Sequence, residues 1–410
     1  MTTNNHLKNF VEIDSKTREE LSKTADELLE VKHLDLDNTE YLAKALFCLG
    51  KYDESIEQFE RILSLKSDDE QALSNIGINY FLKEDYNTAI AYFNKSLEKD
   101  SDNVTVLSYK MLSHAFLKEY DNAIECGEQI LKGNSKNTLV INRLIDYHFE
   151  LENYDDCLDY ISQIEYKDDY KKALILYESK RYEECIETSS KIKTAESYFL
   201  AGKAYHKLGN TLKAVRYLNK SYEKDLNIDA LFEISKIYFE AEDYRRSVTF
   251  LKKVLVHDDS NIEAYNKIAV AYLNSGKWHD AIEYGEKTLE ISAQVPQAYI
   301  TIAEAHFQLE GNFEKSKQII DKGICQNPDS PELWAQKGGY NFPEDYFAFR
   351  HAYEKALSLS PNDCAIHKEY IYLLLLGDDE EEAKLHYNQM LLYNPLFEKS
   401  FQELKKSMFL

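Results

Sequence analysis

The sequence contains few of the residues that break helices. Its 410 residues include 6 prolines and 13 glycines, and every proline lies after residue 295. A chain of many short strands needs frequent turns, and turns use proline and glycine heavily. The scarcity of both residues therefore predicts a mainly helical protein.

Positive charge and long apolar stretches are also scarce. The chain has 49 Lys+Arg against 72 Asp+Glu, a net charge of −23, and its longest apolar stretch, Ile371 to Leu376, is too short to span a bilayer. The negative excess repels phosphate backbones and anionic lipids, so we expect no nucleic acid partner and no membrane partner. The first five residues lack the basic and apolar regions of a signal peptide, which predicts a cytoplasmic protein.

Motifs for catalysis and metal binding are absent from the sequence. The six cysteines are thinly spread with no Cys-x-x-Cys pair, which favours reduced thiols over disulfides or a structural metal. No phosphate-binding loop, H-E-x-x-H, G-x-S-x-G or dinucleotide fingerprint occurs. The sequence therefore predicts a protein that is not an enzyme and binds no cofactor or metal.

What the chain does contain is an internal repeat, in which an aromatic residue is followed three positions later by a small one. The copies are Tyr52/Ser55, Tyr86/Ala89, Tyr120/Ala123, Tyr154/Cys157, Tyr182/Cys185, Tyr244/Ser247, Trp278/Ala281 and Phe313/Ser316. From Ser55 to Cys157 the small residue recurs at three intervals of 34 residues. The next two intervals are 28 residues, to Cys185, and 29 residues, to Ala214. Intervals of 33, 34 and 35 residues then lead to Ser316. Two weaker steps continue the period to Phe349 and Ala383, so most of the chain is periodic.

Each repeat divides into two helix-length halves. A glycine or polar residue precedes the aromatic residue, as in Gly50-Lys51-Tyr52, and marks a turn. In the second half, apolar residues follow the small residue by four and seven, as Phe59 and Ile62 follow Ser55, which places them on one helix face. The pattern predicts a helix, a tight turn and a second helix.

The repeat resembles the tetratricopeptide repeat, a 34-residue unit with the pattern W-x2-L-G-x2-Y and then A-x3-F. The best match runs from Leu73, Ile76, Gly77 and Tyr80 to Ala89 and Phe93. We count eleven units over about residues 36–397. The resemblance implies an all-α, right-handed superhelical solenoid of stacked antiparallel helix pairs, with the first helix of each pair lining a concave groove.

The spacing also suggests how the chain is organised. Such an array needs polar caps at its ends, and the irregular steps of 28 and 29 mark a shortened repeat or a subdomain junction. The expected parts are an N-terminal capping helix region over 1–35, N-terminal repeats over 36–166, the shortened repeat or junction over 167–193, C-terminal repeats over 194–397 and a C-terminal capping helix over 398–410.

Two features depart from the pattern. Gly127 and Gly285 replace the second-helix aromatic residue, so we expect looser packing in those repeats. Glycines and a proline within residues 338–345 interrupt a first helix, so we expect either a kink or a local loop there.

The resemblance also assigns a candidate groove to first-helix residues that flank the small position. They are Tyr109, Asn142, Arg143, Phe149, Phe199, Lys203, Lys207, Phe232, Lys236, Asn266, Lys267 and Asn274. The four lysines form a cationic stripe interleaved with Phe199 and Phe232. Such a stripe suits an extended acidic peptide or a terminal carboxylate, with Asn142 and Asn266 bonding to its backbone. The alternative is that these lysines pair with Glu196, Glu233 and Glu263 and bind nothing.

The sequence thus predicts a non-enzymatic interaction scaffold or adaptor that binds a partner protein or an extended, acidic peptide in its groove. The alternative function is a peptide-sensing signalling regulator that switches a bound effector protein. The sequence leaves the oligomeric state open.

Overall fold

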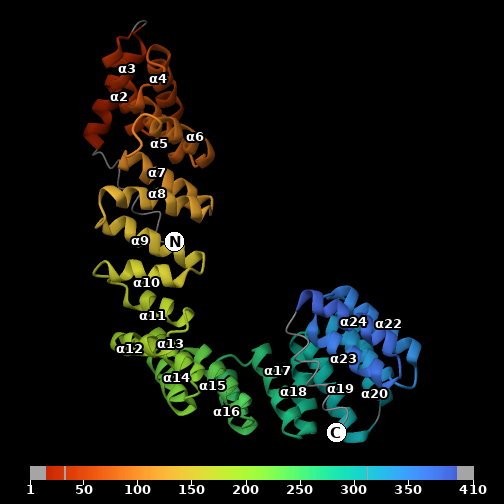
Figure 1. Cartoon of the computed structure of the whole chain (residues 1–410). Helices are drawn as coiled ribbons and strands as arrows, with labels where there is room; N and C mark the ends of the chain where they lie inside the picture. The colour runs from red at the N-terminus through yellow and green to blue at the C-terminus, as the bar shows by residue number, and fades with distance from the viewer. Residues whose placement is uncertain (1–14, 32–33, 312, 395–410) are drawn as a thin grey trace. The chain divides into compact units, whose positions relative to one another are not determined.

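The computed structural model describes residues 15–31, 34–311 and 313–394, and all regular secondary structure in these residues is α-helical (Figure 1). The chain divides into two compact units, residues 1–192 and residues 193–410, which are taken separately below. The capping helix expected over 398–410 lies outside the described residues.

The described residues of unit 1 form one helix followed by five antiparallel helix pairs. The helices are α2 (Ser15–Leu29), α3 (Leu36–Cys48), α4 (Tyr52–Leu65), α5 (Glu70–Leu82), α6 (Tyr86–Leu97), α7 (Val104–Phe116), α8 (Tyr120–Gly133), α9 (Thr138–Glu150), α10 (Tyr154–Ser162), α11 (Asp169–Glu178) and α12 (Tyr182–Ile192). α2 packs on α3, where Ala25 is fully buried beside Leu42 and Leu46. The repeats in which the sequence period is shortened contain short helices: α10, α11 and α12 have 9, 10 and 11 residues.

In unit 2 the residues that the structure describes form six pairs of the same kind. The helices are α13 (Ala195–Lys207), α14 (Thr211–Asp225), α15 (Ile228–Glu240), α16 (Tyr244–His257), α17 (Ile262–Asn274), α18 (Trp278–Ile291), α19 (Pro296–Glu310), α20 (Phe313–Gln326), α21 (Pro331–Asn341), α22 (Tyr346–Leu359), α23 (Cys364–Leu376) and α24 (Glu380–Tyr393). In both units each helix contacts mainly the helices one or two places away in the chain. The eleven pairs within the described residues match the eleven repeats predicted from the sequence.

The repeated aromatic residue marks where the second helix begins. α4, α6, α8, α10 and α12 in unit 1 all start at the tyrosine of the phrase, and α16, α18, α20 and α22 in unit 2 start at Tyr, Trp or Phe. The small residue three positions later is fully buried, for example Ser55, Ala89 and Cys157. The sequence periodicity therefore located both the turn and the helix contact.

Most of the tight turns within helix pairs contain one residue with left-handed backbone conformation. Gly50 has φ of 77° and Gly276 has φ of 72°, where glycine is the unstrained choice. The same position is occupied by Glu84 and Lys118 in other repeats, with φ of 63° and 61°. These repeats accept some backbone strain, because a Cβ atom disfavours this conformation.

Side-chain caps start many of the first helices. Asp69 accepts a hydrogen bond from the backbone nitrogen of Ala72 at 2.9 Å, and Asn261 accepts one from Ala264 at 2.9 Å. An Asp or Asn at this position satisfies a backbone donor that has no partner inside the helix. The polar inter-repeat turns of the sequence therefore set the helix starts.

The two repeats with glycine in place of an aromatic residue are tightly packed, so the expectation of looser packing is wrong. A Cβ atom on Gly127 would lie 2.8 Å from Leu144, and one on Gly285 would lie 2.6 Å from Ile302. A branched aliphatic side chain from the next first helix occupies the space, and both are buried. The volume that the second helix gives up is filled by the following repeat.

The glycines at 338 and 339 do not interrupt their helix. α21 continues through both residues to Asn341, and the connection to α22 spans 342–345 and contains a cis bond at Phe342-Pro343. Gly338 is needed for packing, because a Cβ atom there would lie 2.5 Å from the ring of Tyr353. The glycines therefore lie inside the helix and permit a close helix approach, whereas the proline lies in the connection that follows.

Candidate functional site

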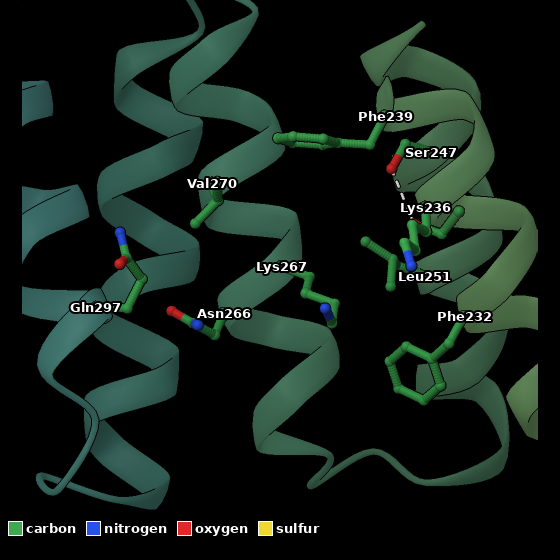
Figure 2. A pocket seen from close by; sticks show the side chains of 10 residues that line it. Phe232, Lys236, Phe239, Ser247, Leu251, Asn266, Lys267, Val270 and Gln297 are labelled. Carbon is green, nitrogen blue, oxygen red and sulfur yellow. Dashed lines mark hydrogen bonds between the residues drawn. The ribbon is translucent and has the colours of Figure 1, made fainter. Parts of the chain in front are cut away.

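Unit 2 contains a pocket of about 370 Å³ between the first helices α15 and α17 (Figure 2). Its floor comes from the second helix α16, and one further residue comes from the start of α19. The lining residues are Phe232, Ser235, Lys236, Phe239, Ser247, Leu251, Asn266, Lys267, Val270 and Gln297.

Helix geometry explains why these side chains meet. Phe232, Lys236 and Phe239 are spaced by four and three residues, so they share one face of α15. Asn266 and Val270 are likewise four apart on α17. Figure 2 shows the α15 side chains projecting toward α17. The pocket is thus the space between the exposed faces of two consecutive first helices.

The floor of the pocket is polar at one point and apolar elsewhere. The hydroxyls of Ser235 and Ser247 are hydrogen bonded to each other at 2.8 Å and are buried, which satisfies both groups. Leu251 is 1% exposed beside them. A ligand therefore finds an apolar floor, because the serine pair is already satisfied internally.

One polar atom in the pocket has no partner. The side-chain Oδ1 of Asn266 is buried and accepts no hydrogen bond from any described residue. In Figure 2 the Asn266 amide points toward Gln297. A buried acceptor without a donor costs about 1–3 kcal/mol, so a ligand N–H placed there would recover free energy.

The two lysines of the pocket differ in their pairing. Lys267 Nζ lies 3.5 Å from Oε1 of Glu263, and these side chains are 49% and 65% exposed. An exposed ion pair between side chains one helical turn apart contributes little to stability, so a ligand carboxylate can replace Glu263 as the partner of Lys267. Lys236 is exposed and forms no ion pair with the described residues. Both ammonium groups are therefore accessible to an anionic ligand.

The pocket brings together four of the residues predicted from the sequence, namely Phe232, Lys236, Asn266 and Lys267. Asn274 lies one helical turn beyond Val270, and its amide donates to the Val270 carbonyl oxygen at 2.8 Å. That amide is committed to its own helix.

The predicted residues of α13 lie outside the pocket lining. Phe199 packs against the core cluster of α14 and α15, and the Lys203 ammonium lies 5.7 Å from the centroid of its ring. Lys207 is exposed at the end of the helix. Since α13 contacts α15, these residues continue the first-helix surface beside the pocket.

The predicted residues of unit 1 fall into three different environments. Arg143 lines a separate pocket of about 390 Å³, and Asn142 beside it is exposed. Phe149 packs edge-on against Tyr154 at 5.8 Å. Tyr109 is half-buried against the rings of two phenylalanines of the preceding repeat, and burial raises the pKa of its hydroxyl.

Sequence reasoning missed several pocket residues. Phe239 lies three positions after Lys236 and could have been found from helical spacing alone. Gln297 could not, because it comes from the next repeat and its approach depends on how α17 and α19 pack. Leu251 comes from the second helix α16, whereas the predicted groove drew only on first helices.

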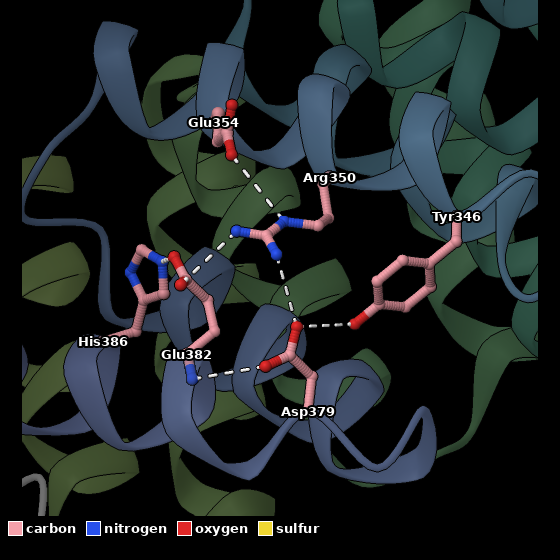
Figure 3. A network of polar contacts seen from close by, with 6 residues as sticks. All are labelled: Tyr346, Arg350, Glu354, Asp379, Glu382 and His386. Carbon is pink, nitrogen blue, oxygen red and sulfur yellow. Dashed lines mark hydrogen bonds and ion pairs between the residues drawn. The ribbon is translucent and has the colours of Figure 1, made fainter.

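A second polar cluster in unit 2 connects α22 with the N-cap and first turns of α24 (Figure 3). Arg350 lies 3.3 Å from Asp379 and 3.4 Å from Glu382, and the Tyr346 hydroxyl donates to Asp379 at 3.0 Å. Nε2 of His386 lies 3.6 Å from Glu382. Because Arg350 on α22 contacts both Asp379 and Glu382, the cluster links the last two described pairs.

No group of three or more His, Cys, Asp or Glu side chains in the described ranges is arranged to hold a metal ion. Cys157 and Cys185 are fully buried free thiols, and burial raises the pKa of Cys185 to about 11. Across residues 15–31, 34–311 and 313–394, none of the helices combines the length and apolarity that crossing a membrane requires.

Comparison with known proteins gives one family. Residues 35–102, 195–225 and 272–337 each match a sequence profile described as tetratricopeptide repeat. Tetratricopeptide repeat protein 8 of Caenorhabditis elegans is 26% identical over 111 residues, which is 27% of this chain and 22% of that protein. The matched segment is thus a small part of the relative.

Solved structures that resemble the chain include a tetratricopeptide repeat protein from Parabacteroides merdae, with 16% identity and a TM-score of 0.44 over 66% of this chain and 98% of that chain. A second is Naa15/Naa10 bound to HypK-THB, with 11% identity and a TM-score of 0.43 over 86% of this chain and 68% of that chain.

Proposed function

This chain is a tetratricopeptide-repeat protein, and we propose that it is a non-enzymatic scaffold that binds an extended segment of a partner protein across α15 and α17. The observation that carries the proposal is the pocket in unit 2. It combines apolar walls, two accessible lysines and a buried acceptor without a partner. Pockets of this composition suit peptides that offer both an apolar anchor and polar backbone.

The chemistry of the pocket specifies the segment. An apolar side chain of the partner would fill the space between Phe232, Phe239 and Val270. A backbone N–H of the partner would donate to Oδ1 of Asn266, and a neighbouring carboxylate would contact Lys236 and Lys267. The preferred ligand is therefore an extended peptide with an apolar residue beside an acidic residue or a terminal carboxylate.

The thinly spread, free cysteines favour a reducing compartment, so we place this scaffold in the cytoplasm.

The test is differential capture of partners from native lysate by the full chain. The pocket variant carries Lys236→Glu and Lys267→Glu, and the matched control carries Lys322→Glu and Lys355→Glu. The control lysines are exposed on the second helices α20 and α22, so both variants change the net charge equally. Partners retained by wild type and control but lost from the pocket variant support the proposal.

A steric variant tests the apolar part of the pocket without changing charge. Val270 is half-exposed in the pocket, so Val270→Phe should fill the space while leaving the helix intact. The same partners should be lost from this variant. Partner sets that are identical across wild type, pocket variant and steric variant would refute binding at this pocket.

A further inference from the structure

The charge of the chain is unevenly distributed. Residues 195–287 contain 14 Lys+Arg and 14 Asp+Glu, so the whole net charge of −23 lies outside this segment. Within it, cationic side chains gather on the second helices α14 and α16. They are Lys213, Arg216, Lys220, Lys224, Arg245, Arg246, Lys252 and Lys253, and these eight residues are called the outer basic face. α16 contains no Asp or Glu.

The two helices that carry these cations are connected at two points. The Tyr222 hydroxyl of α14 and Nε2 of His257 on α16 are hydrogen bonded at 2.8 Å. Tyr222 and Phe250 also pack against the same buried clusters. The cations of α14 and α16 therefore belong to consecutive second helices that are joined by direct side-chain contacts.

The outer basic face is distinct from the pocket. Ser247 and Leu251 lie on the side of α16 that forms the pocket floor. Arg245 precedes Ser247 by two residues and Lys253 follows Leu251 by two, which places each of them about 200° around the helix from that floor residue. Seven of the eight cations are exposed, and Lys220 is half-buried. A ligand on this face would not enter the pocket.

Aromatic rings support two of the four cations of α14. The Lys213 ammonium lies 5.3 Å from the centroid of the Tyr205 ring. Lys220 lies 5.3 Å from the Tyr198 ring and 4.9 Å from the Tyr217 ring. The face of an aromatic ring attracts a cation without neutralising its charge.

The same arrangement recurs on α16. Lys253 lies 4.6 Å from the ring of Phe250, and Lys252 lies 5.3 Å from the ring of Tyr284. Arg246 stands over a tyrosine ring at 5.5 Å and also pairs with Asp243 at 3.2 Å. Among the described residues this is the one ion pair of the outer basic face, although the charge of Lys252 also acts on the nearby carboxylate of Glu283. Seven of the eight cations therefore form no ion pair with a described residue, and five of the eight lie over a ring.

We propose that the outer basic face binds a short Asp/Glu-rich segment of a partner protein. Charge complementarity selects an anionic ligand, and the exposed, ring-supported cations offer it charge contacts without a shaped cavity. The segment needs no apolar anchor, which separates this ligand from the one proposed for the pocket.

The dimensions of the face favour an acidic protein segment over a nucleic acid. α14 and α16 have 15 and 14 residues, which corresponds to about 20 Å of helix and about six residues of extended peptide. Beyond this length a nucleic acid would bring further phosphates toward a chain whose remaining charge is −23. A short acidic segment gains the attraction and avoids that repulsion.

The experiment measures binding of a fluorescein-labelled 12-residue peptide of alternating Asp and Glu to the full chain by fluorescence anisotropy. The outer-face variant carries Lys213→Gln, Lys220→Gln, Lys252→Gln and Lys253→Gln. The matched control carries Lys203→Gln, Lys207→Gln, Lys236→Gln and Lys267→Gln. Both variants lose four positive charges within unit 2, so a general electrostatic effect would be the same in both.

The expected result is a Kd raised at least tenfold in the outer-face variant and changed less than twofold in the control. Equal weakening in both variants would overturn the proposal, since it would mean that only the overall field matters. Weakening in the control alone would place the probe on the first helices α13, α15 and α17 and would also overturn it. Failure of wild type to bind the probe at low salt would have the same consequence.

Further measurements keep the result interpretable. Arg216→Gln, Lys224→Gln and Arg245→Gln remove cations for which no ring contact is present within the described residues, so this variant weakens binding without disturbing the packing that the lysines make with rings. A 12-nucleotide single-stranded RNA that binds the face more tightly than the peptide would overturn the choice of partner.

Salt-sensitive dimerisation of wild type that the outer-face variant abolishes would overturn it too, because the occupant of the face would then be a second copy of this chain. The pocket proposal is judged by a different variant and by ligands with an apolar anchor, so either proposal can fail alone.

Discussion

Gly77 in α5 allows the most direct test of the packing, because its missing side chain is required by a neighbour. A Cβ atom built on Gly77 would lie 2.5 Å from a ring carbon of Phe93 in α6, closer than carbon atoms approach without a shift. Phe93 is itself 0% exposed and sits in a core cluster with Phe81, Ala89 and Val106. The ring therefore has little space to retreat, and Gly77→Ala should destabilise this pair.

The size of the effect follows from two opposing contributions. Forcing an extra methyl group into a filled core costs about 1–3 kcal/mol. Replacing a glycine inside a helix by alanine returns up to about 1 kcal/mol. We expect Gly77→Ala to lower the local unfolding free energy by about 1–2 kcal/mol, a factor of about 5–30 in the opening equilibrium.

Hydrogen exchange followed by mass spectrometry suits this test, because stability in a repeat array is local. Peptides covering α5 and α6 should exchange about 5–30 times faster in Gly77→Ala. The matched control is Gly133→Ala at the end of α8, where the added Cβ atom has nothing within 4 Å. That variant should be unchanged or slightly more stable, since only the helix propensity acts.

A double variant separates the clash from other causes. Adding Phe93→Leu to Gly77→Ala removes the ring that the methyl group meets, so the two changes together should cost less than the sum of the single changes. Unchanged exchange in Gly77→Ala, or strict additivity in the double variant, would refute the argument that this contact limits the position to glycine.

Three further predictions concern the turns and the C-terminal pairs. Glu84→Gly should raise the unfolding free energy of its repeat by about 0.5–1 kcal/mol, because glycine removes the strain of φ at 63°, and hydrogen exchange of the flanking helices measures it. Burial lowers the pKa of His367 and His386 below the unfolded value of about 6.5, so stability is complete above that pH and falls as pH drops through the folded values. Thermal unfolding of wild type between pH 7.5 and 5 should show this loss, and replacing both histidines by glutamine should flatten the dependence. Arg350→Gln should destabilise the last pairs by about 1–2 kcal/mol in chemical denaturation, since it leaves two half-buried carboxylates without their cation.

The sequence predicted the fold well because the determinants of each repeat lie close together in the chain. The aromatic residue at the start of the second helix and the small residue three positions later act within a single turn, as Tyr86 and Ala89 show. The role of Gly285 could not be predicted from its own repeat, since the group that fills its space is Ile302 of the next repeat. Residues within one repeat determine where its helices begin and end, whereas the packing around a buried position also depends on side chains from the adjacent repeat.

The candidate site was less predictable for the same reason. Helical spacing gathers Phe232 and Lys236 on one face, but whether a pocket forms depends on the distance between α15 and α17. The outer basic face could not be predicted from one repeat because its cations occur singly or in pairs on two different second helices. Only the fold connects these helices, through contacts such as the hydrogen bond between Tyr222 and His257.

The restriction of helix contacts to near neighbours in the chain has a consequence for how the protein is made. Each pair finds its partners within the pair just before or just after it, so little of the fold depends on bringing together distant parts of the polypeptide. Proteins with such local contacts fold fast, and segments can fold in the order in which they leave the ribosome. Each finished pair then offers the next one a preformed surface, and the growing chain exposes at any moment only the apolar face of its most recent helix.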